Sequence, residues 1–144
     1  MIEWEVRLLE EIFIGEQLAG ILIRSNYRAE GINFFTGPEF SQQLGYMNRP
    51  EGHVIAPHIH KDVKRQVRKT QEVLFIKSGR VLVEFYDDKF KYSDSRILEQ
   101  GDIILLADCG HGFKMLEDSE IFEVKQGPYA GENDKIRFAG KNNE

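Results

Sequence analysis

The sequence predicts an all-β domain, and two observations lead to this prediction. Short apolar or alternating runs recur along most of the 144-residue chain, and turn-forming residues separate them. After Gly15, almost no stretch repeats its apolar residues at the helical period. Hydrophobic residues make up 41% of the chain, which is enough for one core in a domain of this length. The pattern is typical of a β-sandwich or barrel, here a single domain over residues 1–144.

The N-terminal half is expected to hold a short helical segment followed by four strands. Ile2, Val6 and Leu9 have near-helical spacing, which predicts a helical turn or two within the first eleven residues. Apolar runs then predict strands at residues 18–23, 32–35, 44–47 and 54–60. The stretches SNYRAEG, TGP and NRPEG separate these strands and are rich in turn-forming residues.

The C-terminal half is expected to begin with a hairpin. EVLFI at residues 72–76 and VLVEFY at residues 81–86 flank the turn signal SGR, so residues 71–86 have the pattern of two paired strands. Further strands are predicted at residues 97–99, 103–106, 113–116 and 121–125. The mostly polar residues 127–144 are predicted to end in a frayed tail.

Charge and composition exclude several classes of partner. The net charge of −5 and the acidic pI near 5.4 argue against nucleic acid as the main partner. The N-terminus lacks the features of a signal peptide, and no stretch has the pattern of a membrane-spanning segment. One cysteine allows no disulfide within the chain, which fits a reducing compartment. We therefore expect a cytoplasmic protein.

Two histidines in PHIHKD are the first candidates for chemistry. Side chains alternate between the faces of a strand, so His58 and His60 point the same way if residues 54–60 form a strand. Two imidazoles one strand step apart reach a single metal ion at about 2.0–2.2 Å. For such a pair alone, two surface or hydrogen-bonded histidines would be the simpler interpretation.

Glu72 and His111 complete a candidate ligand set. Glu72 shares a strand face with Leu74 and Ile76, and a carboxylate on an apolar inward face is costly unless it is paired or binds a metal. The alternative for Glu72 is a surface position at a strand edge. His111 lies between two glycines in CGHGF, which leave its imidazole uncrowded. Three histidines and one carboxylate suit a divalent transition metal such as iron, manganese, zinc or nickel.

Residues 61–71, KDVKRQVRKTQ, form a basic stretch between these motifs. One interpretation is a solvated face; the other is an anion clamp in which Arg65 and Arg68 bind a substrate phosphate or carboxylate. Tyr129, in QGPYAG, is the most loop-like tyrosine, and with Glu72 it is a candidate catalytic residue, although packing at the rim is the alternative. Cys109 is expected to be a small core residue, with a reactive thiol beside the metal as the alternative.

The motifs resemble those of the cupin family. The first cupin motif has His-x-His, a Glu, then six residues and a Gly; the matching residues here are His58, His60, Glu72 and Gly79. The second has Gly-Asp, an apolar strand, a turn and a His; the matching residues are Gly101, Asp102 and His111, with IILL as the strand.

The chain departs from the cupin pattern at three places. Eleven residues separate His60 from Glu72, where the family has three or four. Ala107 stands at the position of the usual Pro in the second motif. His111 comes one residue early, and Met115 occupies the position of a later Asn.

The resemblance covers about residues 40–126, and it implies a fold, a site and an assembly. The fold is a cupin-like double-stranded β-helix, or jelly-roll barrel, after a short N-terminal segment. The metal lies inside the barrel, with ligands His58, His60, Glu72 and His111. Cupins often form homodimers through sheet edges, and the apolar N-terminal residues around Trp4 are candidates to cover or exchange there. The tracts TQEVLFIKSGRVLVEFYDD, GHGFKMLED and EVKQGPY are also similar to cupin metalloproteins encoded among bacterial surface-polysaccharide genes, which implies a carbohydrate context.

Two classes of function are compatible with these motifs. One is a metal-dependent enzyme, an oxygenase or isomerase, that acts on a small polar molecule such as a sugar or a carboxylic acid. A metal-independent sugar-nucleotide epimerase would instead use His111 or His60 as a base and a tyrosine as an acid. The other class is a non-catalytic module that binds a metal and a small ligand as a sensor or carrier.

Overall fold

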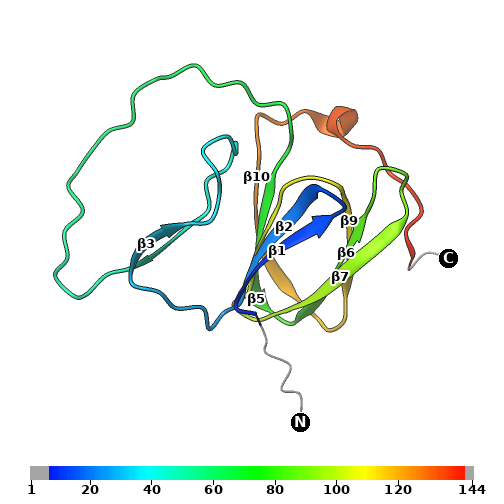
Figure 1. The fold of residues 1–144 in the computed structure, drawn as a ribbon, viewed down its shortest axis with the longest axis horizontal. Coiled ribbons are helices and arrows are strands. Elements are labelled where there is room, and N and C mark those ends of the chain that lie inside the picture. Colours follow the sequence, from blue (N-terminus) through cyan, green and yellow to red (C-terminus); the bar gives the residue numbers. More distant parts are fainter. Residues whose placement is uncertain (1–6, 142–144) are drawn as a thin grey trace, which may run out of the picture.

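The regular secondary structure of the protein consists almost wholly of antiparallel β-strands (Figure 1). The structure, a computed structural model, describes residues 7–141. Its strands are β1 (Leu9–Ile14), β2 (Gln17–Ile23), β3 (Gly31–Phe34), β4 (Gly45–Asn48), β5 (Glu72–Ser78), β6 (Arg80–Tyr86), β7 (Tyr92–Glu99), β8 (Ile103–Leu106), β9 (Gly110–Met115) and β10 (Glu120–Lys125). One turn of 3₁₀ helix, η1 (Gly131–Asp134), follows them. The predicted all-β class is confirmed.

The strands form three sheets. A five-stranded sheet has the order β1-β2-β8-β5-β10, a three-stranded sheet has the order β7-β6-β9, and β3 pairs with β4. β10 is therefore one edge of the large sheet, and β9 is one edge of the three-stranded sheet. No helix in residues 7–141 is long and apolar enough to cross a membrane.

The main hydrophobic core lies between the two larger sheets. The large sheet contributes the buried residues Ile12, Ala19, Leu22, Leu74, Ile76, Ile104 and Leu106, and the three-stranded sheet contributes Val81, Val83, Phe85 and Leu98. Alternation along β6 turns every second residue inward, which places Val81, Val83 and Phe85 on one face. Burying each large aliphatic or aromatic side chain contributes about 1.5–3 kcal/mol, so this cluster is the main source of stability. The core includes residues of β1 and β2, which precede the predicted barrel core of residues 40–126.

The large sheet is also covered on its outer face. Residues of β2 and β8 that point away from the main core pack against the chain between β2 and β4; the buried members are Ile21, Ile23, Leu105 and Ala107, and their neighbours include Tyr27, Phe35, Phe40 and Leu44. Strands buried on both faces carry continuous apolar runs, which explains the sequences LAGILI and IILL.

The hairpin predicted for residues 71–86 is wrong, although both of its strands exist. β5 belongs to the large sheet and β6 to the three-stranded sheet, so the single residue between them, Gly79, forms a corner. Gly79 has φ +92°, and a Cβ there would overlap Ser119 Oγ and the Asp118 carbonyl oxygen. The chain therefore crosses from one sheet to the other at Gly79, which packs against the turn before β10.

Asp102 fastens the turn before β8 to the end of β2. Its carboxylate is buried and accepts hydrogen bonds from Arg24 Nη1 at 3.0 Å, from the Ser25 N–H at 2.9 Å and from the Glu99 N–H at 2.7 Å. Breaking such a buried pair typically costs about 3–5 kcal/mol. These bonds hold β8, and β8 leads directly into the turn before His111.

Two predicted elements differ from the structure: the helical turn near the N-terminus and the strand that carries the histidine pair. Of the predicted helical turn, residues 1–6 lie outside the described residues and Leu9 begins strand β1. The strand predicted at residues 54–60 is wrong, because residues 49–71 contain no strand. This stretch, which we call the 49–71 segment, forms a long arc on the side of β3 and returns to β5 (Figure 1). Residues 54–60 have no strand partner, and without one an alternating sequence forms no sheet.

Candidate functional site

The core is open along β9. Phe113 and Met115 lie on the core face of β9, because their partners in the register are core residues with no exposed surface, Val83 and Val81. Phe113 is nevertheless 40% exposed and Met115 is 47% exposed. His111 shares this face, opposite Phe85. Among residues 7–141, nothing covers the sandwich at its β9 edge, and polar side chains reach the interior there.

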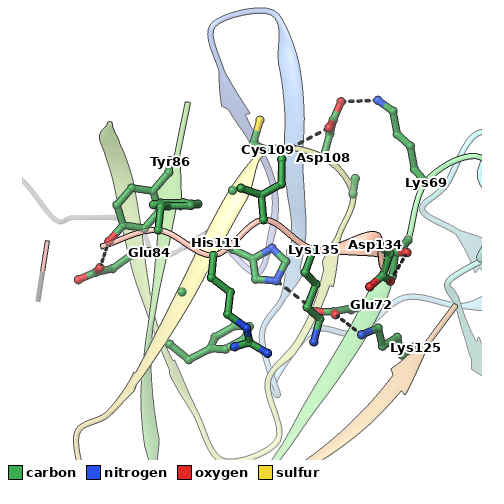
Figure 2. A pocket seen from close by; sticks show the side chains of 18 of the residues that line it. Lys69, Glu72, Glu84, Tyr86, Asp108, Cys109, His111, Lys125, Asp134 and Lys135 are labelled. Carbon is green, nitrogen blue, oxygen red and sulfur yellow. Dashed lines mark hydrogen bonds and ion pairs between the residues drawn. The ribbon is translucent and has the colours of Figure 1, made fainter. Parts of the chain in front are cut away.

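A cavity of about 1120 Å³ occupies this open side. Its walls come from the starts of β5 and β9, the turn between β8 and β9, the end of β10 and the C-terminal residues 133–140. Figure 2 shows the side chains that converge on it. A cavity of this size accommodates a small organic ligand.

Glu72 and His111 form the polar centre of the cavity. Glu72 begins β5 and is only 8% exposed, and His111 Nε2 lies 3.2 Å from Glu72 Oε2. Lys125, opposite Glu72 in the β5–β10 register, places its Nζ 3.7 Å from Glu72 Oε1. The hydrogen bond with His111 lowers the pKa of Glu72; burial opposes this shift, and the charge of Lys125 adds to it. The carboxylate therefore stays ionised well below neutral pH, held between an imidazole and an ammonium group (Figure 2).

Tyr86 and Glu84 form a second polar group on the cavity wall, on the outer face of β6. The Tyr86 hydroxyl donates to Glu84 Oε2 at 2.5 Å and accepts from the Lys141 N–H at 3.0 Å. Phe138 packs edge-on against the Tyr86 ring, with centroids 5.1 Å apart, and stacks on Phe90 at 4.7 Å. Burial, and next the hydrogen bond to Glu84, raise the pKa of Tyr86. Phe138 and Lys141, near the C-terminus, thus cover Tyr86, whose hydroxyl stays protonated. The sequence pattern did not single out this tyrosine.

Charged side chains of both signs line the cavity. The basic ones are Arg68, Lys69, Lys125, Lys135 and Arg137, and the acidic ones are Glu72, Glu84, Asp108, Glu123 and Asp134. Lys135 lies close enough to Glu72 to help lower its pKa. Walls of this kind suit a polar ligand that carries an anionic group together with hydroxyl or amide groups.

Lys69 and Asp108 join the end of the 49–71 segment to the turn before β9. Lys69 Nζ lies 2.5 Å from Asp108 Oδ2, and the Cys109 N–H donates to the other carboxylate oxygen at 2.9 Å. Nearby, Thr70 Oγ1 donates to Asp134 Oδ2 at 2.9 Å. These bonds hold the C-terminal end of the 49–71 segment beside the cavity.

Replacing Asp108 with Asn is expected to destabilise the protein at neutral pH but not in acid. Burial raises the pKa of Asp108, but the hydrogen bonds from Lys69 and the Cys109 N–H outweigh it and hold the pKa below 3.8. Because the folded-state pKa is the lower one, the ionised carboxylate adds stability above about pH 4, and this is lost as pH falls through the folded-state pKa. Free energies of unfolding from urea titrations at several pH values should therefore converge on acidification; a constant difference between the two proteins would contradict this role.

His58 and His60 lie apart from Glu72 and His111. Their rings form an edge-on pair with centroids 5.2 Å apart on the 49–71 segment, and both residues are exposed. His58 Nδ1 lies 2.9 Å from the Ala56 carbonyl oxygen. Within residues 7–141, no three His, Cys, Asp or Glu side chains come close enough together to hold a metal ion. The structure thus presents the four predicted ligands as two pairs.

The other predicted site residues have mixed positions. Arg68 lines the cavity, whereas Arg65 is exposed and is not part of the lining. Tyr129 is 93% exposed and also lies outside the lining. Cys109 is partly buried and packs against the main core, and burial, with the negative charge of Asp108, raises the pKa of its thiol. A raised pKa disfavours the reactive thiolate, and Cys109 also lines the cavity, so it lies between the core and the site.

No family model, no curated protein and no solved structure matches the chain. The site must therefore be judged on its own geometry: an ionised carboxylate paired with an imidazole, at the open edge of a β-sandwich, in a cavity with basic and acidic walls.

Proposed function

We propose that the protein is a metal-binding cupin that holds a divalent transition metal and a small polar ligand in this cavity. The observation that carries the proposal is the 3.2 Å separation of Glu72 Oε2 and His111 Nε2. Ligand atoms at 2.0–2.2 Å from one tetrahedral or octahedral ion lie about 2.8–3.6 Å apart at neighbouring positions. The 3.2 Å of this ion pair falls within that range, so the two side chains could bind one metal without a large rearrangement, and they are the kinds of donor that such metals bind.

The remaining ligands in this proposal are His58 and His60. Their rings already lie beside each other, and eleven residues link His60 to Glu72, a reach of up to about 40 Å when extended. Three imidazoles and one carboxylate suit iron, manganese, zinc or nickel and leave positions open for a ligand. A metal bound there would polarise an oxygen of that ligand.

We also propose that the strands close into the cupin jelly roll. Two facts support this: β9 and β10 each have a free edge beside the cavity, and residues 54–60 have the alternating pattern of a strand without being paired. Unpaired edges are normally covered in soluble β-proteins. One strand of the segment added to β10 and another added to β9 would cover both edges and bring the histidine pair toward His111.

The ligand in this proposal is a small anionic molecule, sugar-related or a carboxylic acid. Lys125 and Lys135 lie near Glu72, and Arg68 lies on the cavity wall, so an anionic group beside the metal would meet several cations. Glu72 itself is held by His111 and Lys125 and would keep its orientation while the ligand binds.

Metal content tests the proposal directly. Protein purified without added metal should carry close to one equivalent of a transition metal per chain by elemental analysis, and the His58→Ala/His60→Ala variant should lose it. The Arg65→Ala variant, altered on the same segment, should keep its metal. A wild-type protein that stays metal-free after incubation with zinc, manganese, iron and nickel would overturn the proposal.

A second candidate is metal-independent acid–base catalysis, favoured by the Glu72–His111 hydrogen bond. A carboxylate that accepts from one imidazole nitrogen leaves the other nitrogen as a base, which is the arrangement of an oriented catalytic histidine. Such a protein would exchange the α-hydrogen of a nucleoside-diphosphate-linked keto sugar with D₂O after complete chelation of metal. Exchange that disappears on chelation would count against this candidate.

A further inference from the structure

The 49–71 segment is exposed along nearly its whole length. Every residue from 47 to 69 is exposed, including apolar side chains that a soluble protein normally buries. These are Val54 at 78%, Ile55 at 54%, Ile59 at 89%, Val63 at 57% and Val67 at 44% exposure. Five exposed aliphatic side chains within fourteen residues indicate a surface that binds another part of a protein.

Between its two ends, the segment forms no hydrogen bond, ion pair or ring contact with the rest of residues 7–141. Within the described part of the chain, residues 50–67 form hydrogen bonds and ring contacts only among themselves: the His53 N–H to the Pro50 carbonyl oxygen, His58 to Ala56, and His58 to His60. Figure 1 shows the segment leaving β4 and arcing away from the two larger sheets before it returns to β5. It does not fold back on the open edges beside it.

The domain offers a surface that matches the segment. The free edges of β9 and β10 flank the cavity, and the exposed core-face residues Phe113 and Met115 lie along one of them. A strand added to such an edge gains backbone hydrogen bonds and covers apolar side chains at once.

Charge also matches the segment to the rest of the protein. Residues 49–71 contain six basic and two acidic residues, a net charge of +4, and the whole chain carries −5. The remainder of the chain therefore carries −9, and Glu123 and Asp134 lie on the cavity wall beside the β10 edge. The opposite net charges attract the segment to the remainder of any copy of the protein.

We propose that two copies of the protein exchange this segment. The segment of each copy lies on the free β9 and β10 edges of the other, so that each metal site combines Glu72 and His111 of one chain with His58 and His60 of the partner subunit. Exchange of identical elements is a low-cost route to a symmetric dimer, because the contacts within one chain and between chains are the same. The segment runs away from the β9 and β10 edges of its own chain, and we therefore place it on the same edges of the partner subunit. This inference rests on the proposed function and adds that the site is shared.

Mixed dimers test the shared site. A chain with His58→Ala/His60→Ala and a differently tagged chain with Glu72→Gln/His111→Ala are co-expressed, and dimers carrying both tags are isolated. With exchange, one of the two sites in each mixed dimer has all four ligands, so the mixed dimer should bind about half as much zinc as the wild-type dimer. Without exchange, both sites lack ligands and the mixed dimer should bind almost none. Dimers of either variant alone are the controls and should bind none.

A second measurement keeps the exchange testable if the wild type binds no metal. In a Cys109→Ser background, Ala56→Cys in one tagged chain and Phe113→Cys in the other place thiols on the histidine face of the segment and on the core face of β9. A short bismaleimide should join the two tags covalently if the segment is exchanged. A monomer by light scattering, or a dimer without this cross-link, would overturn the exchange. Zinc bound by the wild type but not by the mixed dimer would overturn it and leave the proposed function intact.

Discussion

Replacing His111 with alanine, or Glu72 with glutamine, is expected to lower the affinity of the protein for zinc or manganese by at least about 100-fold. His111 Nε2 and Glu72 Oε2 lie 3.2 Å apart, and in the proposed site each substitution removes one of the four metal ligands. Loss of a residue that merely supports a ligand already costs about 10–100-fold in affinity, and loss of a ligand costs more. Isothermal titration of metal-free protein measures the effect.

The control for this prediction is Tyr129→Phe. Tyr129 is 93% exposed and lies outside the cavity lining, so its variant should bind metal as the wild type does. Circular dichroism and the urea midpoint establish that each variant is folded. If His111→Ala and Glu72→Gln bind metal within about threefold of the wild type, the pair is not part of a metal site.

Replacing Gly79 with alanine is expected to lower the free energy of unfolding by about 3 kcal/mol or more. A residue with a side chain is strained at φ +92°, which costs on the order of 1–3 kcal/mol. At Gly79, the new Cβ would also overlap the Asp118 carbonyl oxygen, and backbone cannot move aside as a flexible side chain can. The corner between the two sheets would have to shift.

Gly15→Ala is the matched control for Gly79→Ala. Gly15 also has positive φ, +61°, but a Cβ there meets nothing within 4 Å. The control therefore includes the backbone strain without the overlap, and it should cost only about 1 kcal/mol. Urea unfolding of both variants gives the comparison, provided that the m-values agree. Equal losses for the two variants would mean that the packing of Gly79 against the Asp118–Ser119 turn contributes nothing.

Strand positions could be predicted well because they depend on local pattern. Alternation and short apolar runs predicted β2, β3, β5, β6, β8 and β10 to within about two residues. The inward direction of Glu72 followed from the same rule, because Leu74 and Ile76 share its face and are buried. Pairing depends on distant segments, and here the prediction failed: β5 and β6 are consecutive yet lie in different sheets.

The candidate site was predictable only in part. His111 and Glu72 were both selected from the sequence, and the structure brings them within 3.2 Å although 38 residues separate them. Tyr86 was not singled out, because its burial depends on Phe138 and Lys141 folding back over the outer face of β6. Nothing in the residues around Tyr86 indicates that a segment 50 residues later will cover it.

By itself, the sequence determined the all-β class, the inward face of β5 and the kinds of side chain available for a site, because these depend on residues a few positions apart. The tertiary structure alone decided which strands pair, that the core stays open at β9, and that the histidine pair lies on a segment remote from Glu72 and His111. Strand pairing and closure depend on contacts between segments that are far apart in the chain. Each such contact costs chain entropy and gains buried surface, and no short stretch of residues determines the balance between the two.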